Sequence, residues 1–159
     1  MNTILFIESM LIFAPILAAN QGAGLARMLD FPLAKVPVSR MYLGENKTLA
    51  AYYMGPALGG ITTYLLWADR PLLIGHLLGL GAVLGDHVKS LIKRWRGIPP
   101  GEKWFWDRVD FAIGGIVTAW LLVSGFSWQH AVVIFAAAWL VHVVGNQISF
   151  WLGLRDTPH

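Results

Sequence analysis

The sequence predicts an all-α integral membrane protein with about five transmembrane helices, built as one domain over residues 1–159. Hydrophobic residues make up 56% of the chain and charged residues only 13%, whereas a typical soluble domain carries about 25% charged residues. A chain of this length cannot hide so much apolar surface from water, because small domains keep a large exposed fraction. Its apolar residues also fall into separate runs near the roughly 20 residues that a membrane-spanning helix requires.

Five apolar runs account for the expected spans. They cover about residues 4–19, 48–67, 72–92, 111–126 and 130–152. The short polar turn before Pro71 separates the second run from the third, since proline suits the start of a helix. The first run is expected to be a span because it contains Glu8 and no basic residue precedes it. The alternative is a cleaved signal peptide followed by four spans.

Basic residues set the expected orientation. They gather in two segments, about residues 20–47 and 93–110, and in the C-terminal tail, while Arg70 lies on the opposite side. Because Lys and Arg accumulate on the cytoplasmic face, the sequence predicts a multi-pass cell-membrane protein with its N-terminus outside. Both long loops and the C-terminus would be cytoplasmic. These loops explain the net charge of +3 without a nucleic-acid partner, and the absence of cysteine excludes disulfides and thiolate sites.

Acidic residues share these basic segments at helical spacing. Asp86, Lys89 and Lys93 follow an i, i+3, i+7 pattern that places them on one face of the third span. Asp107 and Asp110 are three residues apart at the start of the fourth span and should also share a face. An aspartate inside a span is costly and usually has a partner or a function.

A hairpin would bring these carboxylates together. Residues 97–101 contain two glycines and two prolines, so they should turn the chain back. Clustered carboxylates repel one another unless a cation lies among them, and oxygen ligands favour Mg²⁺. Basic residues beside such a site favour a polyphosphate substrate. A salt-bridged hairpin without metal, using neighbours such as Lys89 and Arg108, explains the spacing equally well.

A second segment points toward phosphate. Residues 43–48 form a glycine-containing turn that ends in Lys47-Thr48 at the expected start of a helix. Backbone N–H groups at a helix N-terminus attract anions. The complete Walker pattern is absent, so this is not a P-loop ATPase. In the alternative interpretation, Thr48 is only a helix N-cap and Lys47 is solvated.

In these motifs the sequence resembles the CDP-archaeol synthase family, membrane cytidylyltransferases related to the phosphatidate cytidylyltransferases. GENKT at 44–48 resembles the family's Gly-Asp-Gly-Lys-Thr-like loop. LGD at 84–86 and SLIKR at 90–94 resemble a second motif, and DRVDF at 107–111 resembles the Asp-x-x-Asp-Phe motif that opens a helix. The resemblance covers nearly the whole chain and implies a five-span fold.

The resemblance implies an enzyme that uses CTP and Mg²⁺ to activate a membrane lipid phosphate, giving a CDP-lipid and pyrophosphate. Archaeal members act on an isoprenoid diether glycerol phosphate. The implied metal-binding and catalytic residues are Asp86, Asp107 and Asp110, with Lys93 as a further catalytic residue. The implied substrate-binding residues are Lys47, Thr48, Lys89 and Arg94.

One departure from the family pattern bears on the substrate. Family members usually continue Lys-Thr with Trp-Arg-Gly, but here residues 49–51 are Leu-Ala-Ala and the arginine is missing. This leaves open another lipid phosphate, weak activity, or a replacement contact from Lys47 or Arg40. The alternative functions are a small membrane transporter, which would use polar groups in its spans, and a degenerate homologue that binds lipid without catalysis. The sequence indicates no oligomeric state.

Overall fold

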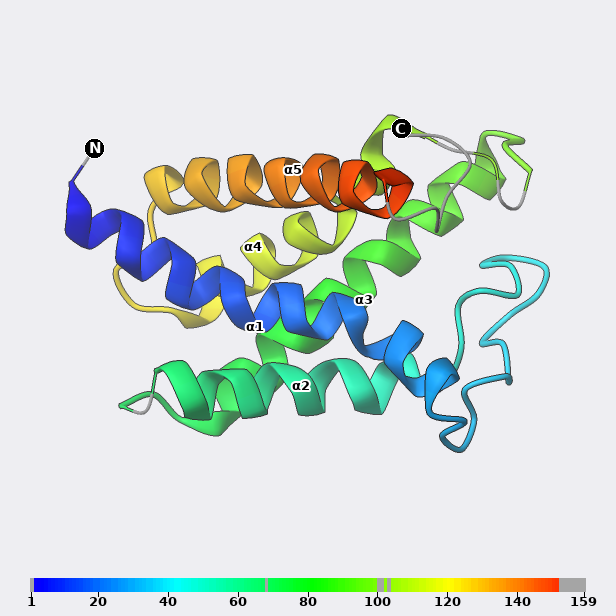
Figure 1. Ribbon diagram of the computed structural model, residues 1–159, viewed down its shortest axis with the longest axis horizontal. Helices are drawn as coiled ribbons and strands as arrows, with labels where there is room; N and C mark the ends of the chain where they lie inside the picture. Colours follow the sequence, from blue (N-terminus) through cyan, green and yellow to red (C-terminus); the bar gives the residue numbers. More distant parts are fainter. Residues whose placement is uncertain (1, 68, 100–101, 103, 152–159) are drawn as a thin grey trace.

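The protein is described here by a computed structural model, which describes residues 2–67, 69–99, 102 and 104–151 (Figure 1). Over these residues the chain forms five α-helices and a short 3₁₀ helix. They are α1 Thr3–Met28, α2 Ala51–Leu66, α3 Leu72–Trp95, η1 Phe105–Arg108, α4 Asp110–Leu122 and α5 Trp128–Trp151. The predicted all-α class is confirmed. Pro100, Gly101 and Lys103, and the expected end of the fifth span at Leu152 with Arg155, lie outside the described residues.

Three helices in the described part of the chain, α1, α3 and α5, are long and apolar enough to cross a membrane. The expected second and fourth spans form shorter helices, α2 with 16 residues and α4 with 13. Each is cut short by its local backbone. Thr48 pairs with Pro37 in an isolated antiparallel bridge, so α2 starts only at Ala51. Val123 is extended where α4 ends, shortly before Gly125 with a positive φ of 81°.

The first long loop is shorter than the sequence predicted. Helix α1 does not end near residue 19 but continues through Met28, so the loop begins at residue 29 rather than 20. The polar pair Asn20-Gln21 lies inside the helix, and Gly22 there fits so closely against α2 that an added Cβ would lie 2.9 Å from the Gly55 nitrogen. The helix stops where Asp30 adopts a positive φ of 52°. In the second loop, residues 93–95 likewise belong to α3.

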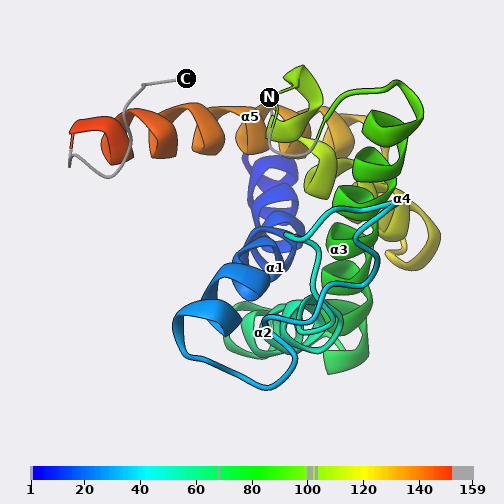
Figure 2. The same cartoon turned by 90° about the vertical axis from the view of Figure 1, so that its right-hand side faces the viewer.

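The connections divide between the two ends of the helix bundle. Figure 1 shows the N-terminus, the α2–α3 turn and the α4–α5 connection at one end, on the left. The 29–50 loop and the segment after α3 lie at the other end, on the right. Seen from that end, the 29–50 loop passes in front of α1 and α3 (Figure 2). The two segments that carry the predicted site motifs therefore share one end of the molecule.

Small residues hold α3 close to its neighbours. Helix α3 packs extensively on both α2 and α4. A Cβ on Gly85 would lie 2.3 Å from the carbonyl oxygen of Asp110, and one on Gly114 would lie 2.1 Å from the carbonyl oxygen of Gly81. Glycine at both positions thus lets the two backbones touch, as small residues do between membrane helices. This contact places Asp110 directly beside the part of α3 that carries Asp86.

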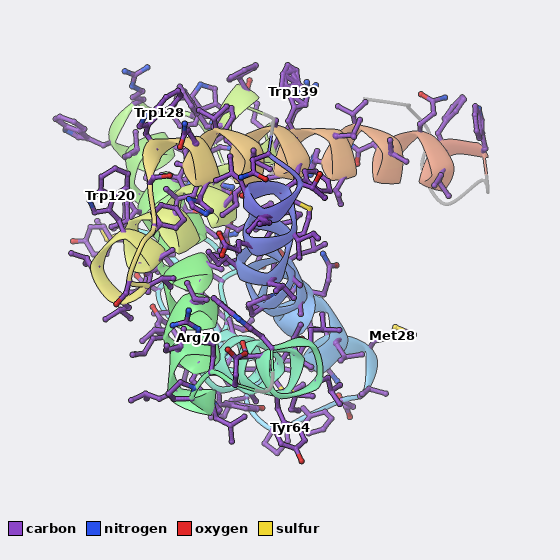
Figure 3. The ribbon with its side chains drawn as sticks, turned by 90° about the vertical axis from the view of Figure 1, so that its left-hand side faces the viewer. Met28, Tyr64, Arg70, Trp120, Trp128 and Trp139 are labelled. Atoms are coloured by element: carbon purple, nitrogen blue, oxygen red, sulfur yellow. The ribbon has the colours of Figure 1, made fainter. Side chains whose placement is uncertain are left out.

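The outer surface of the bundle is apolar. Large hydrophobic side chains are exposed on every α-helix. Figure 3 shows Tyr64, Trp120, Trp128 and Trp139 projecting outward from their helices, and all four are exposed. Water would disfavour so large an apolar exterior, whereas lipid chains match it. The exterior therefore agrees with a membrane environment.

Candidate active site

Lys89 lies among the three aspartates that the sequence grouped together. Its Nζ atom is 3.2 Å from Asp86 Oδ1, 2.8 Å from Asp107 Oδ1 and 2.6 Å from Asp110 Oδ2. Asp86 and Lys89 come from α3, Asp107 from η1 and Asp110 from the first turn of α4. The predicted convergence of the carboxylates across the hairpin is confirmed. An ammonium group stands at the point of convergence.

Two further lysines complete the cluster. Lys47 Nζ lies 2.5 Å from Asp86 Oδ1 and also donates to Asp86 Oδ2. Lys93 Nζ lies 3.0 Å from Asp107 Oδ2 and donates to the carbonyl oxygen of Glu102. Three lysines thus face three aspartates, and their formal charges cancel. The arrangement matches the salt-bridged alternative in kind.

In the salt-bridged alternative Asp107 would pair with its neighbour Arg108, but Asp107 makes other contacts. Asp107 pairs with Lys89 and Lys93, whereas the Arg108 guanidinium lies 5.9 Å from the centre of the Trp139 ring. The 3₁₀ turn of η1 causes this, because it directs Asp107 back toward the Trp104 backbone.

Asp107 carries a stable negative charge. Burial by itself raises the pKa of Asp107, but the hydrogen bond with Lys89 and the one from the Trp104 backbone N–H, 2.7 Å long, outweigh it. Attraction to Lys89 and the hydrogen bond from Lys93 act in the same direction, so the pKa lies below the ordinary value of 3.8. The carboxylate is therefore ionised at neutral pH.

The loop that carries Lys47 is fastened to the end of α1 by Arg27. Its Nη2 donates to the carbonyl oxygen of Glu45 at 3.0 Å, and its Nη1 donates to Asn46 Oδ1 at 3.2 Å. Its Nε donates to the carbonyl oxygen of Ala34 at 3.4 Å. The sequence interpretation missed this role, since it placed Arg27 in a loop. The signal would have been a basic residue in the last turn of a longer helix.

Thr48 follows Lys47 in the chain but is not among the residues of the charged cluster or of the cavities beside it. Its side chain is completely buried, and its hydroxyl oxygen has no hydrogen-bond partner in the described part of the chain. Its predicted position at a helix N-terminus is wrong, because the N-cap of α2 is Ala50 and has no side-chain cap. The backbone bridge to Pro37 holds Thr48 away from the helix.

Two cavities meet at Lys89. A polar cavity of about 190 Å³ lies between the 43–47 loop and the end of α3. Its basic lining residues are Lys47, Lys89, Lys93 and Arg94. An apolar groove of about 510 Å³ lies between α3 and α4. Its lining includes Leu84, Val88, Ile92, Trp106, Ile113 and Val117, with Lys89 and Asp110 as its charged residues.

The three carboxylates suit a hard divalent cation in their chemistry. Mg²⁺ prefers carboxylate oxygens, and the cluster offers three aspartates close together. Within the described residues no three acidic or histidine side chains form a ready-made metal site. The Lys89 ammonium occupies the centre instead. The donor set therefore fits Mg²⁺ only after Lys89 moves aside.

Comparisons with known proteins agree in one family. A family model described as CarS-like CDP-archaeol synthase matches residues 3–159. The CDP-archaeol synthase of Aeropyrum pernix is 32% identical over 162 residues, covering 96% of this chain and 91% of that protein. The CDP-archaeol synthase of Thermofilum pendens is 34% identical over 134 residues, covering 82% of this chain and 65% of that protein, just under two thirds of its length.

A solved structure shares the fold. It is described as an intramembrane enzyme for archaeal membrane lipids biosynthesis, and it superposes with a TM-score of 0.74. The two chains are 26% identical over 89% of this chain and 94% of the other. The likeness therefore extends through nearly the whole helix bundle.

Proposed function

The chain belongs to the CDP-archaeol synthase family of membrane CTP-dependent cytidylyltransferases, and from this premise we propose that it transfers the cytidylyl group of CTP to an archaeol-type lipid phosphate. One observation about the site supports this proposal. Lys89 lines both the polar cavity and the apolar groove. A water-soluble triphosphate and a lipid phosphate can therefore meet at a single cationic side chain.

The two cavities divide the substrates by polarity. Lys47, Lys93 and Arg94 surround the polar cavity, where their charges neutralise the triphosphate of CTP. The apolar groove along α3 and α4 receives an isoprenoid chain, because its lining offers aliphatic and tryptophan side chains. The lipid phosphate then lies at the charged end of the groove, next to Lys89.

The reaction is a direct displacement. An oxygen of the lipid phosphate attacks the α-phosphorus of CTP, the bond from that phosphorus to the bridging oxygen breaks, and pyrophosphate leaves with the electron pair. The attacking phosphate is already ionised near neutral pH, so the chain need not supply a strong base. Catalysis comes from alignment of the two substrates and from neutralisation of charge by Lys47 and Lys93.

Mg²⁺ is the metal that this donor set would take. Asp86, Asp107 and Asp110 would hold it, since their carboxylates already converge on one cation. When bound, the ion supplies charge neutralisation at phosphate oxygens. Thr48 has no direct part in this arrangement, because its hydroxyl is buried.

The site faces the cytoplasm in this proposal. The 29–50 loop and the segment after α3 lie at one end of the bundle (Figure 1). Six of the twelve basic residues belong to residues 29–50 and 96–110, and four more belong to the adjoining parts of α1 and α3. Arg70 lies in the turn at the other end. The excess of positive charge on cytoplasmic loops supports this orientation, and CTP would then reach the polar cavity from the cytosol.

The position of the missing arginine offers no phosphate contact in this chain. Ala50 is completely buried there and packs with Ala26 and Ala34. Arg40 is exposed and lies 3.7 Å from Glu45, whereas Lys47 reaches into the charged cluster. Of the two replacements considered from the sequence, Lys47 therefore has the better position to bind phosphate.

Pyrophosphate release tests the proposal. Purified protein would be mixed with CTP, Mg²⁺ and either an isoprenoid diether glycerol phosphate or a diacyl glycerol phosphate, and both products would be measured. Asp110→Asn should lower turnover at least about a hundredfold, a loss comparable to removing one electrostatic contact from a transition state. Asp30→Asn is the matched control, since Asp30 is exposed and pairs only with Lys35 among the described contacts.

Each failure has a distinct meaning. Pyrophosphate release that persists in Asp110→Asn would contradict the role of the aspartate cluster. A folded wild-type protein that releases no pyrophosphate with either lipid would instead support the degenerate lipid-binding homologue. A transporter would also release none, but family membership already argues against it.

A further inference from the structure

We propose that Lys89 is an exchangeable internal cation: its ammonium group holds the three aspartates together in the substrate-free protein, and a divalent cation displaces it toward the lipid phosphate. This inference rests on the proposed function and concerns how the site is prepared for substrates. It assigns Lys89 a positioning role before substrates bind and a substrate contact afterwards.

The first support is the position of the ammonium. Lys89 Nζ lies within 3.2 Å of an oxygen of each aspartate, which is where a metal ion shared by the three carboxylates would sit. A divalent cation and an ammonium group repel each other and compete for the same oxygens. Both therefore cannot keep this position, and binding of one must release the other.

The second support is that each aspartate keeps its orientation without Lys89. Lys47 holds both oxygens of Asp86. The Trp104 backbone N–H, together with Lys93, holds Asp107. The carboxylates would therefore remain in place after the ammonium leaves.

Asp110 completes this arrangement. Its Oδ1 accepts a hydrogen bond of 2.7 Å from the Phe111 backbone N–H, which fixes the carboxylate at the start of α4. Its Oδ2 is buried and has no hydrogen bond of good geometry, although Lys89 Nζ lies 2.6 Å away. Asp110 as a whole is 5% exposed. Once Lys89 leaves, this buried carboxylate oxygen can bind a metal ion.

The third support is a destination for the displaced ammonium. Lys89 also lines the apolar groove, whose charged end it shares with Asp110. The flexible lysine side chain can turn toward that groove, where the lipid phosphate supplies a new anionic partner. Exchange would thus couple metal binding to capture of the lipid phosphate.

Metal binding in the absence of nucleotide and lipid tests the exchange. Mn²⁺, used as a paramagnetic probe for Mg²⁺, would be titrated into wild-type protein, Lys89→Met and Lys93→Met. Lys89→Met should bind Mn²⁺ about tenfold more tightly than wild type, within the usual range of coupling between competing ligands. Lys93→Met removes an equal charge from the same cluster but not from its centre, so its affinity should rise by a clearly smaller factor.

A measurement on the wild-type protein keeps the test independent of folding in the variants. Mn²⁺ should increase the rate at which an amine-reactive reagent labels Lys89, followed by mass spectrometry, relative to the rate at Lys93. The exchange is refuted if Mn²⁺ leaves this ratio unchanged. It is also refuted if folded Lys89→Met binds Mn²⁺ no more tightly than wild type or than Lys93→Met.

Failure of the exchange can be told apart from failure of the proposed function. CTP-dependent pyrophosphate release by the wild type, together with unaltered Mn²⁺ affinity in Lys89→Met, overturns only the exchange. Tighter Mn²⁺ binding in Lys89→Met without pyrophosphate release from the wild type supports the exchange and overturns the cytidylyltransferase assignment.

Discussion

Lys47 Nζ lies 2.5 Å from Asp86 Oδ1, a contact between residues 39 positions apart in the sequence. Lys47 belongs to the loop before α2, and Asp86 belongs to α3. Their side chains are 19% and 25% exposed, so water screens the pair only partly. This ion pair joins the loop to the aspartate cluster and brings a cation to the wall of the polar cavity.

Replacing Lys47 by alanine should lower both stability and activity. Asp86 would still pair with Lys89 at 3.2 Å, but it would lose the ammonium group of Lys47. Its negative charge would then be only partly neutralised in a partly buried site. We expect a loss of about 1–3 kcal/mol in the free energy of unfolding, the usual cost of a poorly satisfied buried group. Thermal denaturation in detergent would measure it.

Lys35→Ala is the control for this change. Lys35 pairs with Asp30 in the same loop, but their side chains are 77% and 76% exposed. Exposed pairs contribute about 0–1 kcal/mol, so the melting temperature should change little. Equal destabilisation by the two substitutions would show that the Lys47–Asp86 pair is not special.

Arg27 should control the affinity for CTP without touching it. Its guanidinium binds Glu45 and Asn46 and thereby holds the loop that ends in Lys47. Arg27→Ala should raise the KM for CTP roughly fivefold to tenfold, which corresponds to about 1 kcal/mol of lost hydrogen bonding. Steady-state kinetics with CTP as the varied substrate would show this.

Two further substitutions, Arg27→Lys and Arg40→Ala, test the role of Arg27. Arg27→Lys should recover only part of the affinity, because an ammonium lacks the planar fork that reaches several acceptors. Arg40→Ala, in the same loop, should leave KM nearly unchanged, since Arg40 is exposed and 3.7 Å from Glu45. An Arg27→Ala variant with the wild-type KM would contradict the clamp.

The contact between α3 and α4 should be intolerant of one methyl group. In Gly85→Ala the new Cβ would meet the carbonyl oxygen of Asp110 at 2.3 Å, and this oxygen is a backbone atom that cannot rotate away. We expect about 1–3 kcal/mol of destabilisation from overpacking. Turnover should fall by more than the loss of folded protein accounts for. The added methyl group pushes α4 away from α3 and thereby moves Asp110 relative to Asp86.

Gly24→Ala isolates this effect from helix propensity. An added Cβ at Gly24 meets no described atom within 4 Å, and the residue lies inside α1. Alanine there should stabilise the helix by up to about 1 kcal/mol. Melting temperature and turnover would be measured for both variants, and wild-type turnover in Gly85→Ala would show that the close approach does not position the site.

Local patterns explain why much of this fold could be predicted. The expected spans at 72–92, 111–126 and 130–152 correspond to α3, α4 and α5 within a few residues. The length of an apolar run and the positions of proline and glycine depend only on residues close together in the chain, so they can be read from the sequence. Asp107 and Asp110 lie beside Asp86 as predicted. However, Asp107 belongs to η1 and only Asp110 belongs to α4, so the two do not share one face of the fourth span.

Contacts between distant segments explain what was missed. Helix α1 extends to Met28, and within this extension Gly22 packs against Gly55 of α2, a contact that no local pattern reveals. Thr48 lost its expected helix position to a bridge with Pro37. The spacing put Lys89 on the right face, but its place at the centre of the aspartates depends on three elements meeting at once.

A large side chain should block the apolar groove without changing CTP binding in the polar cavity. Val117 lines the groove from α4 and is 56% exposed, so a larger side chain can project into the groove without forcing the helices apart. Val117→Trp should lower turnover with a long-chain isoprenoid lipid phosphate by roughly tenfold or more, the effect of losing about 1–2 kcal/mol of chain burial. A short-chain lipid phosphate should be affected much less.

Leu121→Trp is the matched control for Val117→Trp. Leu121 lies one helical turn beyond Val117 on α4, is 76% exposed and does not line the groove. Tryptophan there adds a similar bulk on the lipid-facing surface, so turnover should stay near that of the wild type. CTP affinity, measured separately by calorimetry, should be equal in all three proteins, because the polar cavity lies on the other side of Lys89. If Val117→Trp and Leu121→Trp have the same turnover with the long-chain lipid and the same turnover with the short-chain lipid, the lipid chain binds elsewhere. The proposal that lipid and nucleotide bind on opposite sides of Lys89 is then wrong.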